Sequence, residues 1–240
     1  MRLGIKLLFA ASIAFVLATP GRAYAAAPDD LASVLRRLDT AAANFHSTSA
    51  DFKFVTEQTD PVYDKTTQKG TVYYKRSGKS FQMAAHIRTE ASGEGKDRPV
   101  PKDLVYSGGK VTLYEKLTGE EHVRDAAKYE SYLLLGFGAS GKELADKWEI
   151  KYLGSETLND GKTAVATEKL ELVAKDPDVR KLIPKVTIWV DPARAVSLQQ
   201  VFDMGQGQSR SCYYSNIKLN PSIPDSEFVI KPGSKTKTAN

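Results

Sequence analysis

The sequence predicts a mainly β (α+β) fold, a curled antiparallel sheet or unclosed barrel of about eleven strands. Three observations support this prediction: many short β-rich runs stand between turn signals, one amphipathic helix precedes them, and one helical segment interrupts them. The chain has 240 residues, of which 41% are hydrophobic and 26% are charged. This composition is typical of a folded protein and argues against a disordered, collagen-like or multi-span membrane protein.

Residues 1–25 are predicted to form a cleaved secretory signal peptide. Arg2 and Lys6 give a positive start, Leu7–Ala18 is an apolar run, and Ala23–Ala25 is a small-x-small cleavage site. The apolar run has about 12 residues, fewer than the roughly 18 that span a membrane. No cysteine lies near the cleavage point, so we expect an unanchored periplasmic protein.

Cleavage changes the net charge of the chain. The signal peptide holds three of the 34 basic residues and none of the 29 acidic ones, so the formal net charge falls from +5 to +2. This near-neutral balance removes the main support for nucleic-acid binding. About 215 residues remain, 26–240, which suits a single β-rich domain.

The segment Asp29–Phe45 is predicted to be an amphipathic helix. Six apolar residues recur at three- and four-residue steps and form one stripe: Leu31, Val34, Leu35, Leu38, Ala42 and Phe45. Acidic residues stand at the beginning of the segment, where the positive end of the helix dipole favours them. The apolar stripe needs a surface to cover, and the following strands supply one.

From Thr48 onward the pattern changes to short β-rich runs. The predicted strands are Ser49–Glu57, Gln68–Lys75, Ser80–Arg88, Asp103–Tyr106, Lys110–Lys116, Glu120–Arg124, Trp148–Leu158, Thr163–Leu172, Lys185–Val190, Ala195–Met204 and Ser209–Leu219. Glycine-containing triplets such as Ser77–Lys79 and Asn159–Gly161 favour tight reversals, and Asp191–Arg194 suits a type I turn. Thr89–Lys102 lacks apolar periodicity and is predicted to be a long mobile loop.

A helical insert interrupts the strands between Asp125 and Lys147. Tyr129–Phe137 forms an apolar helical segment, and a glycine-rich break at Gly136–Gly141 separates it from a short helix at Glu143–Lys147. Two interpretations stay open. The insert is either a connector helix in the core or an apolar lid across the mouth of the sheet, hinged at the glycines.

The sequence contains no recognisable catalytic or metal-binding constellation. Cys212 is the single cysteine, and a buried strand position is its simplest role. The three histidines, His46, His86 and His122, are far apart in sequence and form no local ligand pair. Gly136–Lys142 fits part of a phosphate-binding loop, but Glu143 follows where a magnesium ligand should stand. The sequence therefore predicts neither an enzyme nor a bound cofactor.

Five stretches together resemble the periplasmic outer-membrane lipoprotein carrier family, the LolA-like proteins. The resemblance rests mostly on aromatic and turn positions and spans nearly the whole mature chain. Its stretches are Leu38–Lys53, Gly70–Met83, Asp103–Val123, Val186–Pro192 and Ser211–Phe228.

This resemblance implies an unclosed β-barrel whose apolar concave face is covered by lid helices and carries acyl chains. The implied partners are an acylated lipoprotein or lipid cargo, an inner-membrane release complex and an outer-membrane receptor, and we expect a monomer. The candidate lining comprises Phe52, Phe54, Tyr73, Phe81, Met83, Leu113, Leu133, Leu134, Leu135, Phe137, Ile188 and Val201. Ordinary core packing is the alternative for each of them.

Arg76 is the one position to which the resemblance gives a specific role, as the arginine that hydrogen-bonds to lid backbone and holds the empty carrier closed. The alternative is a solvated turn residue. For the whole chain two other functions stay open: a regulatory domain of the same fold that senses mislocalised lipoproteins, and a secreted hydrolase of unrecognised type.

Overall fold

A computed structural model describes residues 30–78, 80–231 and 237–238 of the chain. The predicted signal peptide, residues 1–25, lies outside these residues.

The described residues form one twelve-stranded sheet. Its strands are β1 (Ser47–Gln58), β2 (Asp64–Ser77), β3 (Ser80–Ser92), β4 (Arg98–Ser107), β5 (Lys110–Glu115), β6 (Glu120–Asp125), β7 (Trp148–Asn159), β8 (Ala164–Ala174), β9 (Lys185–Asp191), β10 (Val196–Gly205), β11 (Gln208–Leu219) and β12 (Lys237–Thr238). The spatial order is β12-β6-β5-β4-β3-β2-β1-β11-β10-β9-β8-β7. Neighbours pair antiparallel throughout, except that the two-residue β12 pairs parallel with β6.

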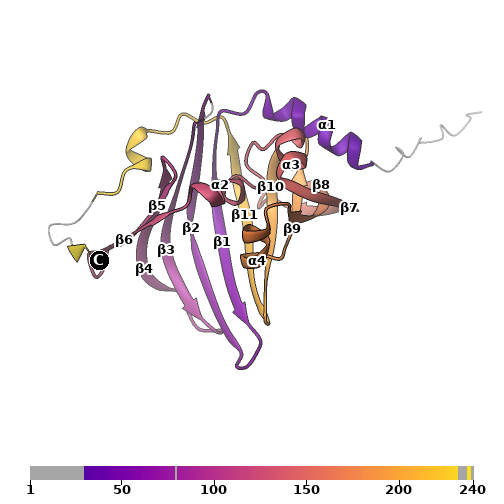
Figure 1. Ribbon diagram of the computed structural model, residues 1–240. Coiled ribbons are helices and arrows are strands. Elements are labelled where there is room, and N and C mark those ends of the chain that lie inside the picture. Colours follow the sequence, from indigo (N-terminus) through magenta and orange to yellow (C-terminus); the bar gives the residue numbers. More distant parts are fainter. Residues whose placement is uncertain (1–29, 79, 232–236, 239–240) are drawn as a thin grey trace, which may run out of the picture.

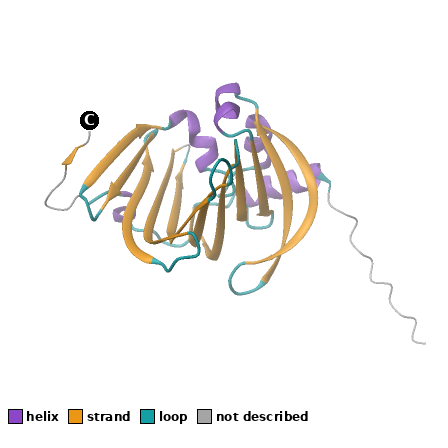
Figure 2. Cartoon of the chain, turned by 90° about the horizontal axis from the view of Figure 1, so that it is seen from below, coloured by secondary structure: helices purple, strands orange, loops and turns teal. Residues whose placement is uncertain are grey.

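The predicted unclosed barrel of about eleven antiparallel strands is confirmed. Strand β1 pairs with β11 and so joins the first six strands to the last five. Because β6 and β7 lie toward opposite ends of the strand order, the sheet does not close on itself within the described residues. Figure 2 shows the curl of the sheet and the helices gathered along one side of it.

The first helix, α1 (Leu31–Ala42), lies within the predicted segment Asp29–Phe45. The Asp30 side chain caps it by accepting a hydrogen bond of 2.7 Å from the backbone N–H of Ser33. Five shorter helices follow among the described residues: three lie between β6 and β7, one lies between β8 and β9, and one follows β11. These are η1 (Ala127–Tyr129), α2 (Glu130–Leu133), α3 (Gly141–Lys147), α4 (Pro177–Leu182) and η2 (Asp225–Phe228).

Helices α1, α2 and α3 lie on one face of the sheet, which we call the inner face (Figure 1). Two apolar clusters fill this side. One lies beneath α1 and includes Leu38, Leu170 and Ile188, and the other lies over strands β1 to β4 and β11. A third cluster packs Ile223 and Phe228 of the C-terminal segment onto the opposite, outer face.

The prediction of a long loop at Thr89–Lys102 is wrong. Strand β3 continues to Ser92 and β4 begins at Arg98, so only residues 93–97 connect them. Polar contacts hold this region instead of apolar ones. The ammonium group of Lys69 in β2, for example, lies 2.7 Å from the carboxylate of Asp97 in the β3–β4 connection. A polar strand of this kind carries no period-two hydrophobic signal.

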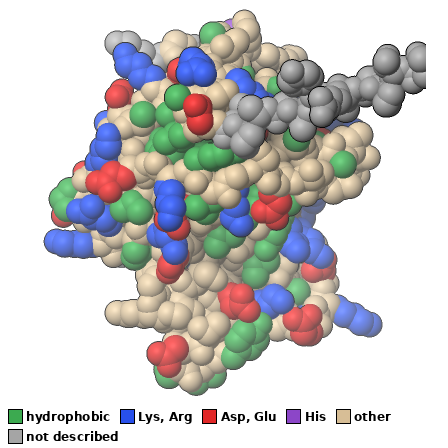
Figure 3. All heavy atoms as spheres, turned by 90° about the vertical axis from the view of Figure 1, so that its right-hand side faces the viewer, with side chains coloured by type: hydrophobic (Ala, Val, Ile, Leu, Met, Phe, Trp, Pro, Cys, Tyr) green, Lys and Arg blue, Asp and Glu red, His purple; other side chains and the backbone are tan. Residues whose placement is uncertain are grey.

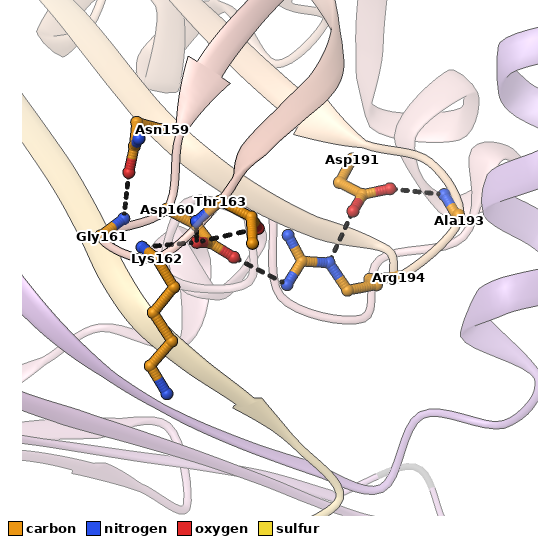
Figure 4. Close-up of polar contacts among 8 residues, drawn as sticks. All are labelled: Asn159, Asp160, Gly161, Lys162, Thr163, Asp191, Ala193 and Arg194. Carbon is orange, nitrogen blue, oxygen red and sulfur yellow. Dashed lines mark hydrogen bonds and ion pairs between the residues drawn. The ribbon is translucent and has the colours of Figure 1, made fainter.

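Two predicted turns are confirmed and are joined by a polar network (Figure 4). The Asp160 carboxylate accepts hydrogen bonds of 3.0 Å from the backbone N–H groups of Lys162 and Thr163, and these bonds hold its pKa below the ordinary value. The Arg194 guanidinium bonds Asp160 at 3.5 Å and Asp191 at 2.5 Å. The network therefore ties the β7–β8 hairpin to the β9–β10 turn.

Strand β7 forms one edge of the sheet, and mixed charges protect it. Figure 3 shows acidic and basic side chains interspersed with hydrophobic ones on this side of the molecule. Pairing of β7 with β8 is irregular between Tyr152 and Gly154, and Gly154 has a φ of 102°. A bulge and nearby charges both discourage the addition of a further strand to an exposed edge.

Candidate functional site

Residues 126–140, which we call the lid segment, cross the inner face of the sheet (Figure 1). The predicted helix Tyr129–Phe137 is shorter than expected, because regular α-helix covers only Glu130–Leu133. Beyond Leu133 the backbone turns, and Gly136 and Gly138 both have a φ of 74°. Left-handed conformations end the helix and lay the rest of the segment against strand β10.

Phe137 is the most deeply placed side chain of the lid segment, with no exposed surface. Its ring stacks on Tyr74 with centroids 4.0 Å apart and meets Tyr214 edge-on at 4.7 Å. Phe81 stacks on Tyr74 in turn and also contacts Tyr106. We call Tyr74, Phe81, Tyr106 and Tyr214 the aromatic cradle.

The two glycines allow the lid segment to approach the sheet closely. A Cβ atom on Gly136 would overlap the Ser197 side chain, and one on Gly138 would overlap the ring of Phe45. Both positions also need positive φ, which favours glycine. The glycines thus serve packing in the arrangement described here, and a hinge at this place stays a prediction.

Strand β10 holds the lid segment through its backbone. The Gly138 N–H donates to the carbonyl of Ala195 at 2.8 Å, and the Ser197 N–H donates to the carbonyl of Gly136 at 2.6 Å. The amide of Gln200 donates to the carbonyl of Leu135. Because Gln200 is only 3% exposed, its bond to the lid is shielded from water.

Arg76, at the end of β2, forms an ion pair with Glu143 of α3, the helix that directly follows the lid segment. Its guanidinium bonds Glu143 of α3 at 3.4 and 3.5 Å, where the resemblance implied lid backbone. Glu143 also closes a capping box with Ser140 at the start of α3. Burial raises the pKa of Glu143, but the hydrogen bonds from Ser140 and the charge of Arg76 together hold it below its ordinary value.

Most of the candidate lining residues share the inner face. The second cluster or its margin contains Phe52, Phe54, Phe81, Met83, Leu133, Leu134 and Phe137. Leu113 pairs with Leu104, which packs against that cluster. Leu135 and Ile188 lie instead in the cluster beneath α1, so they extend the apolar surface toward that helix.

Two candidate lining residues are placed on the outer face, and this corrects the prediction. Tyr73 packs with Ala84 and Phe228 on that face. Val201 follows Gln200, whose side chain reaches the lid, and successive strand residues point to opposite faces. In a strand with apolar residues on both faces, the sequence does not tell which set points inward.

Sequence reasoning missed Tyr74, Tyr106, Tyr214, Ser197 and Gln200. The two tyrosine pairs, at 73–74 and 213–214, were a usable signal, because each places one ring on each face of the sheet. Burial raises the pKa of Tyr74 and of Tyr214, and it raises the pKa of the Cys212 thiol, which lies in the same cluster, to about 12. These groups are therefore neutral at physiological pH.

A cavity of about 540 Å³ opens beside the lid segment. The lid segment, α3, α4 and the adjoining ends of β7 and β8 surround it, and its lining includes Leu134, Glu143, Leu144, Trp148 and Val179. The cavity thus places apolar side chains next to the Arg76–Glu143 pair.

Two features are absent from the described residues. They hold no group of three or more His, Cys, Asp or Glu side chains placed to bind a metal ion. Within the same part of the chain, no helix has the length and apolar character needed to cross a membrane.

Solved structures match the chain at the level of fold, whereas no protein-family model and no curated protein matches it. An uncharacterized conserved protein from Thermus thermophilus superposes with a TM-score of 0.50 at 10% sequence identity. The match covers 87% of this chain and 98% of that chain. The architecture is therefore a known one, adopted here by a very different sequence.

Two further solved structures match with lower TM-scores. A LolA superfamily protein from Nitrosomonas europaea matches with a TM-score of 0.39 and 16% identity over 84% of this chain and 98% of that chain. A chain of the MucA/MucB complex of Pseudomonas aeruginosa matches with a TM-score of 0.46 and 12% identity over 85% of this chain. The present chain spans 62% of that protein, less than two thirds. At identities this low, the likeness to both proteins is one of fold alone.

Proposed function

We propose that this protein is a periplasmic carrier that binds acyl chains of lipoproteins or lipids on its inner face and delivers them toward the outer membrane. One observation carries the proposal. The aromatic cradle is covered by the lid segment, whose Phe137 ring packs against Tyr74 and Tyr214. Movement of that segment would open an apolar surface without dismantling the strands.

The energy of acyl burial is sufficient for such an exchange. An acyl chain of about twelve carbons gains on the order of 9 kcal/mol on leaving water, at about 0.8 kcal/mol per methylene. The Phe137 side chain that it displaces accounts for about 1.5–3 kcal/mol of burial by the same measure. The difference leaves a surplus to offset lid opening and the ordering of the ligand.

In this proposal the mature chain, residues 26–240, is one monomeric domain without a catalytic role. The Arg76–Glu143 pair stabilises the closed lid while the carrier is empty. A release complex in the inner membrane and a receptor in the outer membrane would load and unload it. These partners follow from the resemblance of the sequence to lipoprotein carriers.

The test is binding of a naphthalene sulfonate dye that fluoresces in apolar surroundings, followed by its displacement with an acylated lipopeptide. We expect the wild-type protein to enhance the fluorescence and the lipopeptide to reverse it. Leu134→Asp, which places a charge beside the cradle, should abolish both effects, because an unpaired buried charge is strongly disfavoured. Leu117→Asp is the matched control, since Leu117 is 70% exposed in the β5–β6 turn.

Circular dichroism should show the same strand content in both variants. A wild-type protein that gives no fluorescence, or fluorescence that lipopeptide does not displace, would reject the carrier function. Equal loss of binding in the Leu117→Asp control would reject the assignment of the site to the inner face.

A further inference from the structure

The floor beneath the lid segment is not uniformly apolar. Ser197 and Gln200 of β10 are 0% and 3% exposed, respectively, and both face the lid backbone. They lie next to Phe137, whose backbone forms a β-bridge with Val196. Polar groups so placed need partners, because a buried donor without an acceptor is costly.

The donors in this floor converge on carbonyl groups. The Gln200 amide donates to the carbonyl of Leu135, and the Ser197 backbone N–H donates to the carbonyl of Gly136. The Ser197 hydroxyl is buried and has no hydrogen-bond partner among the described residues. The Gln200 amide and the Ser197 backbone N–H thus donate to the lid segment, and the Ser197 hydroxyl beside them donates to no described residue.

Tyr214 sets the orientation of the Gln200 amide. The Tyr214 hydroxyl donates to Oε1 of Gln200 at 3.2 Å, so the oxygen is engaged and the NH₂ group points to the lid. Tyr214 is itself buried in the same cluster as Tyr74 and Cys212. The hydrogen bond from Tyr214 therefore turns the NH₂ group of Gln200, and not its oxygen, toward the lid segment.

If the lid segment leaves, as the proposed function requires, these donors lose the carbonyls of Leu135 and Gly136. We propose that Gln200 and Ser197 then receive the carbonyl of an ester- or amide-linked acyl chain, and so select carbonyl-linked chains over carbonyl-free alkyl chains. This inference rests on the proposed function. A ligand without the carbonyl oxygen leaves these buried donors without the acceptor that they face, which weakens binding by about tenfold.

The experiment compares two ligands that differ only at the carbonyl, the dodecanoyl monoester and the dodecyl monoether of glycerol. Each competes with the naphthalene sulfonate dye for the wild-type protein. We expect the ester to displace the dye at about one tenth of the concentration that the ether requires. In Gln200→Met, which keeps the length of the side chain but removes the donor, the two ligands should differ by less than about twofold.

Ser197→Ala removes the hydroxyl and keeps the backbone N–H, so it should reduce the ester preference in part. Thr48→Val is the comparison variant, because the Thr48 hydroxyl is also buried without a partner among the described residues, but it belongs to β1, where Thr48 pairs with Tyr74, and not to β10. It should keep the full preference.

Equal displacement by ester and ether in the wild-type protein would overturn the carbonyl subsite while leaving the carrier function intact. Failure of both ligands to displace the dye would overturn the carrier function itself.

Discussion

Replacement of Arg76 by leucine tests whether the rim of the sheet holds the lid side closed. The guanidinium of Arg76 and the carboxylate of Glu143 are 3.4 Å apart, and their side chains are 21% and 53% exposed. An ion pair this open to water contributes about 0.2–1 kcal/mol, less than a buried charged hydrogen bond would. Arg76→Leu should therefore raise the population of open molecules by at most about fivefold.

Cys212 provides an assay that needs no ligand. It is the single cysteine of the chain, it is 6% exposed, and burial raises its pKa to about 12. A thiol reagent at mildly alkaline pH should thus modify it only when the lid is open. The rate of modification in native buffer then reports the open population, and the rise of up to about fivefold in Arg76→Leu is directly measurable.

The double-mutant cycle uses Glu143→Gln, because glutamine removes the charge and still closes the capping box with Ser140. Arg76→Leu and Glu143→Gln should each speed modification, and the double variant should be no faster than either. Arg124→Leu is the control, since this exposed guanidinium donates to the carbonyl of the neighbouring Val123. A rate in Arg76→Leu equal to that of wild type and of Arg124→Leu would refute the latch.

The same pair predicts a pH dependence of lid closure. The pKa of Glu143 is held below its ordinary value of 4.5 in the folded chain. Because the closed state lowers the pKa of Glu143, the ionised carboxylate stabilises that state at pH values above 4.5. This stabilisation is lost as the pH falls through the lowered pKa. Dye binding by the wild-type protein should therefore be weaker than dye binding by Glu143→Gln above about pH 4.5, and it should rise to the level of the variant as the pH falls below that value. Parallel pH profiles for the two proteins would contradict this assignment.

Two further predictions concern the terminus and the lid. The intact mass of the exported protein should correspond to a chain that begins at Ala26 or within a few residues of it, and a soluble periplasmic form that retains Met1 would contradict the signal peptide. Gly136→Ala should lower stability toward urea by about 1–3 kcal/mol and speed Cys212 modification, because the new Cβ meets Ser197 at a positive φ. An unchanged urea midpoint would show that the segment is not packed as described.

The strands of this protein were predictable because turn chemistry separates them. Predicted Trp148–Leu158 corresponds to observed Trp148–Asn159, and the hairpin at 159–161 lies where the Asn-Asp-Gly triplet placed it. Turns are local, so a few residues determine them. The polar extensions of β3 and β4 were missed because cross-strand partners, which are distant in sequence, stabilise them.

The site was less predictable than the fold. Adjacent rings at Tyr73 and Tyr74 are equivalent in the sequence, yet only Tyr74 lies under Phe137. Which ring points inward depends on the register of β2 with β1 and β3, a property of the whole sheet. Arg76 lies at the end of β2, and its partner Glu143 is 67 residues away and carries no local signal.

The lid segment satisfies the inner face as a ligand would. It offers an aromatic ring to the cradle and two carbonyls to the donors of β10, so the cradle, the Gln200 amide and the Ser197 backbone N–H all have partners in the lid segment. An incoming acyl chain must replace both at once, since covering the cradle alone would leave Gln200 unpaired. Competition with a tethered occupant lowers the affinity for any external one. On the proposed function this is an advantage, because a carrier that binds acyl chains against an internal competitor can also release them when the lid closes again.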